Sequence, residues 1–379
     1  MRAGHRNAIL IGVVCFAIGN LVTSVLKDLS VIAFVYGGLV GFATNVVCLT
    51  AAHMIVLCFE VKYVSLSTGI GLSGIGVGLI VNSPAISWIF AHLGWRQSLR
   101  VIAAAYGVMG LLCSYVFYLP PNFKPKDGDE SITQNDFKGK DKVSAIKRIK
   151  SLVKCPLFWS TQVVFFTCTL VVQFLYISVG NYMRILGAND GQITLTSTLM
   201  GVGDLLGRLL MAFATDNICI SRTLVYAFNS FFGGMLMLFL LISKSTFVTS
   251  LIIAGLSIPR GTVYSMILPV AVELFGKKSA VEAISIAYFV TGFANLAGPL
   301  LSDTPFDKSG SYSLTIYISG ILFVFAGFLM TCVELTRRRR NHRKAEDKKK
   351  SDQNAFKIPS SYLAPNFGNS QKQKSHRNV

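Results

Sequence analysis

Long apolar runs, separated by short polar connections, constrain this chain more than any other feature of its sequence. They cover approximately residues 8–26, 31–58, 65–91, 98–118, 157–180, 192–214, 223–242, 246–274, 280–302 and 313–334. A helix of about 20 residues is long enough to cross the hydrocarbon core of a bilayer. An isolated segment in lipid must satisfy its own backbone hydrogen bonds, so each run predicts a helix. The sequence therefore predicts an all-α polytopic membrane protein with about ten transmembrane helices.

Charged residues are scarce in this chain. They make up 14% of the 379 residues, whereas a soluble domain carries about 25%. This composition excludes a soluble globular enzyme, and the sequence contains no Walker A, HExxH or GxSxG motif. The eight cysteines are scattered and form no CxxC pair, so they indicate neither a metal site nor a disulfide framework. We expect a protein that is not an enzyme and that uses no metal or cofactor.

The net charge of +18 comes mostly from two segments. Residues 119–156 and 335–379 hold 9 and 13 Lys+Arg against 5 and 3 Asp+Glu. Basic residues confined to the connections of a membrane protein mark its cytoplasmic side. We therefore expect these segments to face anionic lipid in the cytoplasm, and we expect no nucleic-acid partner. Alternation of basic and non-basic connections along the ten runs then places both termini in the cytoplasm.

The long basic connection divides the chain. Residues 1–118 form a predicted bundle of four spans, 119–156 a cytoplasmic basic loop, 157–334 a bundle of six spans, and 335–379 a basic disordered tail. The end of the loop, residues 143–153, has apolar residues on one helical face and basic residues elsewhere, which is typical of a short helix on a membrane surface.

Charged side chains inside a span indicate function, because each is costly in lipid unless it is paired or hydrated. Asp204 and Arg208 lie four residues apart in the run 192–214, so they share a helical face and can pair. One interpretation is a structural ion pair. The other is a transport site, in which Arg208 binds a substrate carboxylate through its planar fork and Asp204 takes up and releases a proton.

Arg260 is a second charged residue in mid-span, between Pro259 and Gly261. Proline and glycine can interrupt a helix there and free backbone groups for a ligand. Arg260 is therefore a candidate anion-binding residue, with a structural role toward a carbonyl or an acid as the alternative. His53 is expected to be an ordinary core histidine.

Glycine is concentrated in the runs 31–58 and 65–91. Small residues at this density let helix backbones approach closely. Tight packing is one interpretation, and helices that rock past each other during alternating access are the other.

Several short motifs, taken in order, resemble the monocarboxylate transporter family of the major facilitator superfamily. The resemblance covers residues 1–118 and 157–334. Its motifs are Arg2-x-Gly4-x-Arg6, the glycines Gly69, Gly74 and Gly78, the triplet Gly94-Trp95-Arg96, Asp204-x-x-x-Arg208, Leu268-Pro269-Val270 with Glu273-Leu274-Phe275-Gly276, and Gly298-Pro299 with Asp307, Gly310 and Tyr312.

The resemblance implies two six-helix bundles and proton-linked transport of lactate, pyruvate or related acids by alternating access at the plasma membrane. It implies Arg208 as the group for the substrate carboxylate and Asp204 as its proton-coupled partner. Some family members need a single-span immunoglobulin-type partner for surface delivery, so such a partner is a further expectation. The glycines and the Gly94-Trp95-Arg96 triplet are implied to serve packing and conformational change.

The chain also departs from the family pattern. A count of four plus six spans means that the family's first two helices are missing, together with a coupling lysine in the first of them. Leu268 stands where lactate carriers have an aromatic residue, and Arg260 is extra. The departures leave two alternatives open: a non-transporting membrane protein with a regulatory or partner-binding role, and a facilitative carrier of another organic solute. A ten-helix carrier built as five plus five is disfavoured, because the long loop divides four spans from six.

Overall fold

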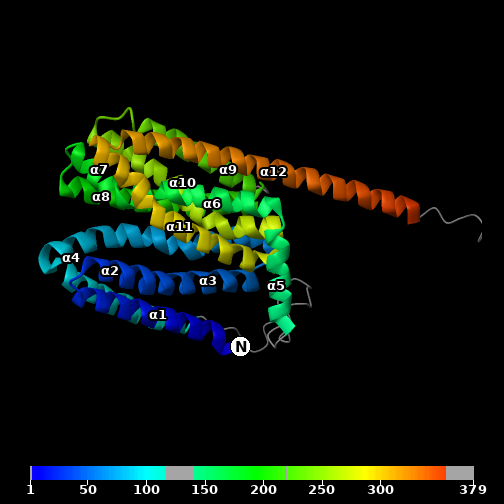
Figure 1. Ribbon diagram of the computed structural model, residues 1–379, viewed down its shortest axis with the longest axis horizontal. Helices are drawn as coiled ribbons and strands as arrows, with labels where there is room; N and C mark the ends of the chain where they lie inside the picture. The colour runs from blue at the N-terminus through cyan, green and yellow to red at the C-terminus, as the bar shows by residue number, and fades with distance from the viewer. Residues whose placement is uncertain (1, 117–139, 218–219, 356–379) are drawn as a thin grey trace, which may run out of the picture. The chain divides into compact units, whose positions relative to one another are not determined.

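The computed structural model describes residues 2–116, 140–217 and 220–355. Within these ranges the regular structure is helical, with no strand (Figure 1). Contacts divide the chain into two units, Met1–Glu334 and Leu335–Val379. The first unit holds every predicted span, and its end coincides with the start of the predicted tail.

The first unit begins with a group of helices before the basic loop. These are α1 (Arg2–Val25), α2 (Leu29–Val35), the π-helical turn η1 (Tyr36–Val40), α3 (Gly41–Cys58), the 3₁₀ turn η2 (Val61–Tyr63) and α4 (Val64–Ser114). Asp28 caps α2, since its side chain accepts a hydrogen bond from the Ser30 amide.

One glycine bends α4 and allows it to serve as two predicted spans. Gly94 lies within the helix at φ 72° and ψ 163°, a conformation that breaks the helical path. A residue with a Cβ rarely adopts this backbone geometry, so glycine is the natural choice here. The chain turns at this point, and the two arms of α4 correspond to the predicted spans 65–91 and 98–118.

The second group of helices follows the loop. It comprises α5 (Lys140–Val153), α6 (Pro156–Ile177), α7 (Val179–Ile185), α8 (Asp190–Asn217), α9 (Arg222–Phe239), α10 (Thr246–Phe275), α11 (Lys277–Ser309) and α12 (Ser313–Ala355). Pro156 opens α6 at a position where its missing N–H costs nothing. Gly276 at φ 77° separates α10 from α11, and Gly310 at φ 66° ends α11.

The prediction of an all-α polytopic protein is confirmed. Eight helices among the described residues are long and apolar enough to cross a membrane. One of them, residues 61–114, includes the bend at Gly94 and therefore covers two predicted spans. The span predicted at 223–242 coincides with α9, which is helical but is not among the eight.

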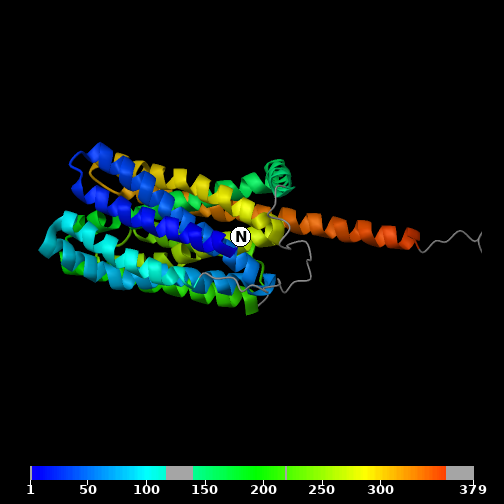
Figure 2. The same cartoon turned by 90° about the horizontal axis from the view of Figure 1, so that it is seen from below.

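The loop and the tail differ in part from expectation. α5 confirms the predicted helix before residue 153, and it runs across the direction of the long helices (Figures 1 and 2). α12 continues as a helix to Ala355, so predicted disorder does not begin at residue 335. The reason is that residues 335–355 are rich in Arg and Lys, which are good helix formers. The rest of both segments, residues 117–139 and 356–379, lies outside the described part.

Glycines bring three helices into close contact around the middle of α8. A Cβ added at Gly207 would lie 2.1 Å from the Ile258 carbonyl oxygen of α10, and one at Gly261 would lie 2.3 Å from the Asp204 carbonyl oxygen. On the other side, a Cβ at Gly76 of α4 would lie 2.9 Å from the Leu205 nitrogen. α8 is therefore held between α4 and α10 at backbone distance.

The three glycines singled out in α4 have different surroundings. A Cβ at Gly69 would lie 2.5 Å from the Ala212 Cβ and 2.8 Å from the Arg208 carbonyl oxygen. Gly74 has nothing within 4 Å, and Gly78 approaches only its own helix at Asn82. Close helix contact in α4 therefore depends on Gly69 and Gly76 rather than on the whole predicted set.

Candidate functional site

Three charged side chains meet in the middle of the first unit. The Arg208 Nε donates to Asp204 Oδ2 at 2.7 Å, and the Arg208 Nη2 donates to Asp204 Oδ1 at 3.3 Å. The Arg260 Nε, from α10, donates to the same Asp204 Oδ1 at 3.3 Å. The spacing of Asp204 and Arg208 on α8 makes the first pair, and the glycine contact between α8 and α10 brings in the second arginine. We call Asp204, Arg208 and Arg260 the charged cluster.

The charged cluster is fully buried and is not electrically balanced. All three side chains are 0% exposed. Two guanidinium groups share one carboxylate, which leaves one uncompensated positive charge. The Nη1 atoms of both Arg208 and Arg260 are buried without a hydrogen-bond partner. An unpaired buried charge costs several kcal/mol, and buried donors are almost always satisfied, so this arrangement fits an anion with two acceptor oxygens.

Arg260 has further contacts that fix its position. Its Nη2 donates to the Met200 carbonyl oxygen at 3.5 Å, and its guanidinium carbon lies 4.5 Å from the centre of the Tyr176 ring of α6. A cation over an aromatic face is stabilised by the ring's quadrupole. Arg260 therefore has both structural partners that the sequence allowed, an acid and a carbonyl.

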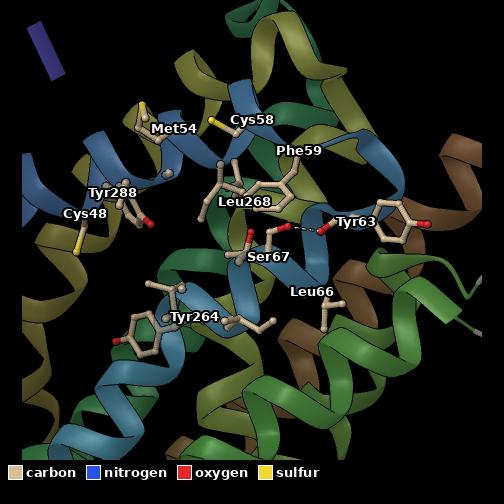
Figure 3. A pocket seen from close by; sticks show the side chains of 17 residues that line it. Cys48, Met54, Cys58, Phe59, Tyr63, Leu66, Ser67, Tyr264, Leu268 and Tyr288 are labelled. Carbon is tan, nitrogen blue, oxygen red and sulfur yellow. Dashed lines mark hydrogen bonds between the residues drawn. The ribbon is translucent and has the colours of Figure 1, made fainter. Parts of the chain in front are cut away.

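The first unit contains a cavity of about 600 Å³, and Tyr264 and Leu268 of α10, the helix that carries Arg260, are among its lining residues. Its walls come from α3, the start of α4, α10 and α11, and they are mostly apolar (Figure 3). Leu268 lies between Tyr288 on one side and Phe59 on the other. Such a volume, with a few polar groups in an apolar lining, is typical of a small-molecule site.

Three cavity residues connect the cavity to the charged cluster. Tyr264 lies within electrostatic reach of all three cluster side chains. Tyr288 and Cys48 lie within electrostatic reach of Arg208. Cys48, Tyr264 and Tyr288 all line the cavity, and they were not recognised in the sequence because they carry no charge.

The other predicted residues lie elsewhere. Arg96, next to the bend at Gly94, donates to the Leu26 carbonyl oxygen at 3.4 Å and stacks 5.0 Å from the centre of the Trp95 ring. The triplet therefore holds the end of α1 against the bend in α4. His53 pairs with His5, with 3.0 Å between Nδ1 and Nε2. Among the described residues, no three His, Cys, Asp or Glu side chains gather as a metal ion would require.

A second ion pair joins the two helix groups and was missed in the sequence. Asp216, at the end of α8, accepts a hydrogen bond from the Leu66 amide at 2.7 Å and from the Arg222 Nη2 at 3.3 Å. Arg222 also donates to Ser65 Oγ at 2.8 Å and to the Val61 carbonyl oxygen at 2.6 Å. Three of these contacts tie η2 and the start of α4 to the α8–α9 connection. Span-end charges are common in any membrane protein, so the sequence offered no signal that these two meet.

The comparison with protein families identifies the superfamily to which this all-α membrane protein belongs. The family model described as Major Facilitator Superfamily matches the chain over residues 1–185 and 163–371, which includes every predicted span. The chain belongs to the major facilitator superfamily. It is accordingly a multi-pass membrane transporter and not an enzyme.

Relatives of this chain are named monocarboxylate transporters. Monocarboxylate transporter 12-B of Danio rerio is 23% identical over 356 residues, which are 88% of this chain and 73% of the relative. Monocarboxylate transporter 12 of Mus musculus is 23% identical, over 85% of this chain and 69% of the relative. Monocarboxylate transporter 10 of Rattus norvegicus is 24% identical, over 84% and 62%. The resemblance to this family is thereby confirmed at the family level.

Solved structures agree on the fold. The fucose:proton symporter of E. coli superposes with a TM-score of 0.65, at 12% identity, over 87% of this chain and 84% of that one. A proton:xylose symporter of the superfamily superposes with a TM-score of 0.61, at 15% identity, over 87% and 80%. These similarities establish the helix arrangement of the superfamily for this chain.

Proposed function

We propose that this transporter carries small organic monocarboxylates, of the lactate and pyruvate type, across the membrane by alternating access. The names of its relatives support this substrate class. The single observation that carries the proposal is the uncompensated positive charge of the charged cluster, with one unpartnered Nη1 on each arginine.

A carboxylate suits this cluster chemically. Its two oxygens can accept one hydrogen bond from each Nη1, and charge-assisted hydrogen bonds of this kind are about twice as strong as neutral ones. The carboxylate would remove the uncompensated charge and satisfy both donors at once. Arg208 and Arg260 are therefore the proposed substrate-binding residues, reached from the cavity past Tyr264 and Tyr288.

Alternating access would act at the contacts of α8. The glycines that bring α4, α8 and α10 together leave no side chain between these backbones, so one helix can tilt against another without repacking a bulky interface. In a proton-linked cycle, Asp204 would be the proton site that the family resemblance implies, and a proton there would compete with both arginines.

The location and the partners are proposed from the charge of the connections and from the family resemblance. We propose the plasma membrane, with both termini in the cytoplasm and the basic loop and tail facing anionic lipid. An immunoglobulin-type single-span partner is a proposal from the resemblance.

The orientation is tested at α11, whose two ends must lie on opposite sides of the membrane. A cysteine that replaces Lys308 should react with an impermeant maleimide on intact cells, and a cysteine that replaces Lys278 should not. The reverse pattern would contradict the orientation.

The binding site is tested by uptake of labelled lactate and pyruvate in cells that express variants. Arg208→Ala should lower saturable uptake by at least about 100-fold, because the charge-assisted hydrogen bonds are lost. Arg208→Lys should lower it by at least about 10-fold, since an ammonium group keeps the charge but loses the planar fork.

A matched control separates this effect from general damage. Arg184 is 67% exposed and pairs with Asp190, which is 86% exposed, so Arg184→Ala should leave uptake unchanged. Uptake is normalised to the amount of each variant in the plasma membrane. Normal uptake by Arg208→Ala would disprove the site.

A further inference from the structure

The net charge of the binding site determines whether a proton must be transported together with the substrate. This inference rests on the proposed function. Asp204 and Arg208 alone would form a neutral pair. A monocarboxylate that joined this pair would leave one unbalanced negative charge in a buried site, and a proton would have to balance it. The third member of the cluster changes this balance, because Arg260 contributes a second positive charge on the same carboxylate.

We propose that Arg260 takes the place of a co-transported proton, so that this chain carries a monocarboxylate as a free anion. The empty site then holds one excess positive charge, and the occupied site is neutral without any proton. The loaded carrier can therefore pass through its occluded state with a balanced charge, which is the condition that proton binding would otherwise fulfil.

Both arginines of the charged cluster are held by Asp204. Its two oxygens accept three hydrogen bonds from two guanidinium groups. Both arginines therefore depend on this one carboxylate as their buried counter-charge.

The other groups around the charged cluster do not include a second carboxylate that could accept a proton. The Tyr176 ring of α6 lies against Arg260, and Tyr264 of α10, Tyr288 of α11 and Cys48 of α3 lie within electrostatic reach of the cluster. None of these is a carboxylate. Within the described part of the chain, Asp204 is the acid that contacts the two arginines.

Transport of a free anion has an electrical consequence. Each cycle moves one negative charge, so the equilibrium accumulation of substrate follows the membrane potential. A potential of 100 mV corresponds to an accumulation of about 50-fold for one charge. Symport of one anion with one proton is electroneutral, and accumulation then follows the pH gradient, at about tenfold per unit.

The experiment uses the purified full chain in liposomes with labelled pyruvate. Counterflow, the exchange of labelled for unlabelled pyruvate, first measures transport without a driving force. Accumulation is then measured with a potassium diffusion potential and, separately, with a pH gradient of one unit. We expect the wild-type chain to accumulate pyruvate when the interior is positive, and to change by less than about twofold with the pH gradient.

Two variants make the assignment to Arg260 specific. Arg260→Gln removes the charge, so accumulation should become insensitive to potential and should follow the pH gradient. Arg260→Lys keeps the charge, so its accumulation should still follow the potential. Should Arg260→Gln fail to fold, the wild-type chain still decides between transport of a free anion and symport with a proton.

The outcomes are distinct. In one outcome, the wild-type chain shows counterflow together with an accumulation that depends on the pH gradient and does not depend on the potential. That result would overturn this inference and leave the proposed function intact. The inference also fails if Arg260→Gln shows counterflow and still follows the potential. Absence of counterflow with both pyruvate and lactate would overturn the proposed function and the inference with it.

Discussion

At the scale of single residues, burial determines which ion pairs contribute to stability. Asp204 and Asp216 each hold an arginine inside the protein, with side chains 0% and 2% exposed. Asp190 and Arg184 form a pair of similar length, 2.9 Å, but on the surface. Exposed pairs contribute little, since water solvates both partners before and after pairing. Removal of one member of a buried pair leaves the other without a partner at large cost.

Asp216 and Asp190 therefore make a matched pair of variants. Asp216→Asn should lower the free energy of unfolding by about 1–3 kcal/mol, because Arg222 loses its charged partner and the Leu66 amide a charged acceptor. Asp190→Asn should change it by less than about 1 kcal/mol. Thermal unfolding of the purified variants in detergent measures both. Equal effects of the two substitutions would contradict the role given to burial.

Contacts between residues close in the sequence could be predicted, whereas contacts between distant residues could not. The pairing of Asp204 with Arg208 could be predicted from their spacing of four and is confirmed at 2.7 Å. Arg260 was recognised as unusual, but its contact with Asp204 spans 56 residues, and no sequence pattern reports how two helices rotate against each other. Tyr264 and Tyr288 could not be recognised at all, since an aromatic residue in a membrane helix is ordinary.

At the scale of elements, the α4–α8 and α8–α10 contacts position the site. The predicted spans coincide with helices because apolar length is a local property of the sequence. The specific glycines that carry helix contacts were less predictable. In α4, Gly74 and Gly76 differ by two residues and therefore point to different sides of the helix, and only the packing shows that Gly76 is the one facing α8.

The two glycines provide the next test. Gly76→Ala should lower the free energy of unfolding by about 1–3 kcal/mol and slow uptake, because its Cβ would lie 2.9 Å from backbone and side-chain atoms of Leu205. Gly74→Ala, with nothing within 4 Å, should be neutral or slightly stabilising, since alanine favours the helix by up to about 1 kcal/mol. Thermal unfolding and uptake of both variants give the comparison. A Gly74→Ala variant that is as damaged as Gly76→Ala would show that the α4–α8 contact is not the reason.

At the scale of the whole molecule, the superfamily fold explains why a buried charged cluster can serve transport. The walls of the cavity come from both helix groups, α3 and α4 of the first and α10 and α11 of the second, and α8 and α10, which carry the charged cluster, pack against each other. The overall class, the helix positions and the superfamily could be predicted from apolar runs and short motifs. The cavity could not, because its shape depends on how distant helices meet.

Transport activity itself is tested at this scale, against the alternative of a family member that has kept the fold without exchanging a ligand. A carrier must bind the same anion from either side of the membrane and release it on the other. A regulatory protein could keep the charged cluster as a structural element without any exchange of ligand. The two therefore differ in counterflow, not in stability or location.

The most direct measurement of the central claim is competition for counterflow in liposomes that contain the wild-type chain. Labelled pyruvate should exchange, and unlabelled monocarboxylates should compete, because their charge fills the unbalanced cluster of Asp204, Arg208 and Arg260. Pyruvamide, which has nearly the same shape without the charge, should compete at least about 100-fold less well. Equal competition by acid and amide, or no exchange of any monocarboxylate, would contradict the account.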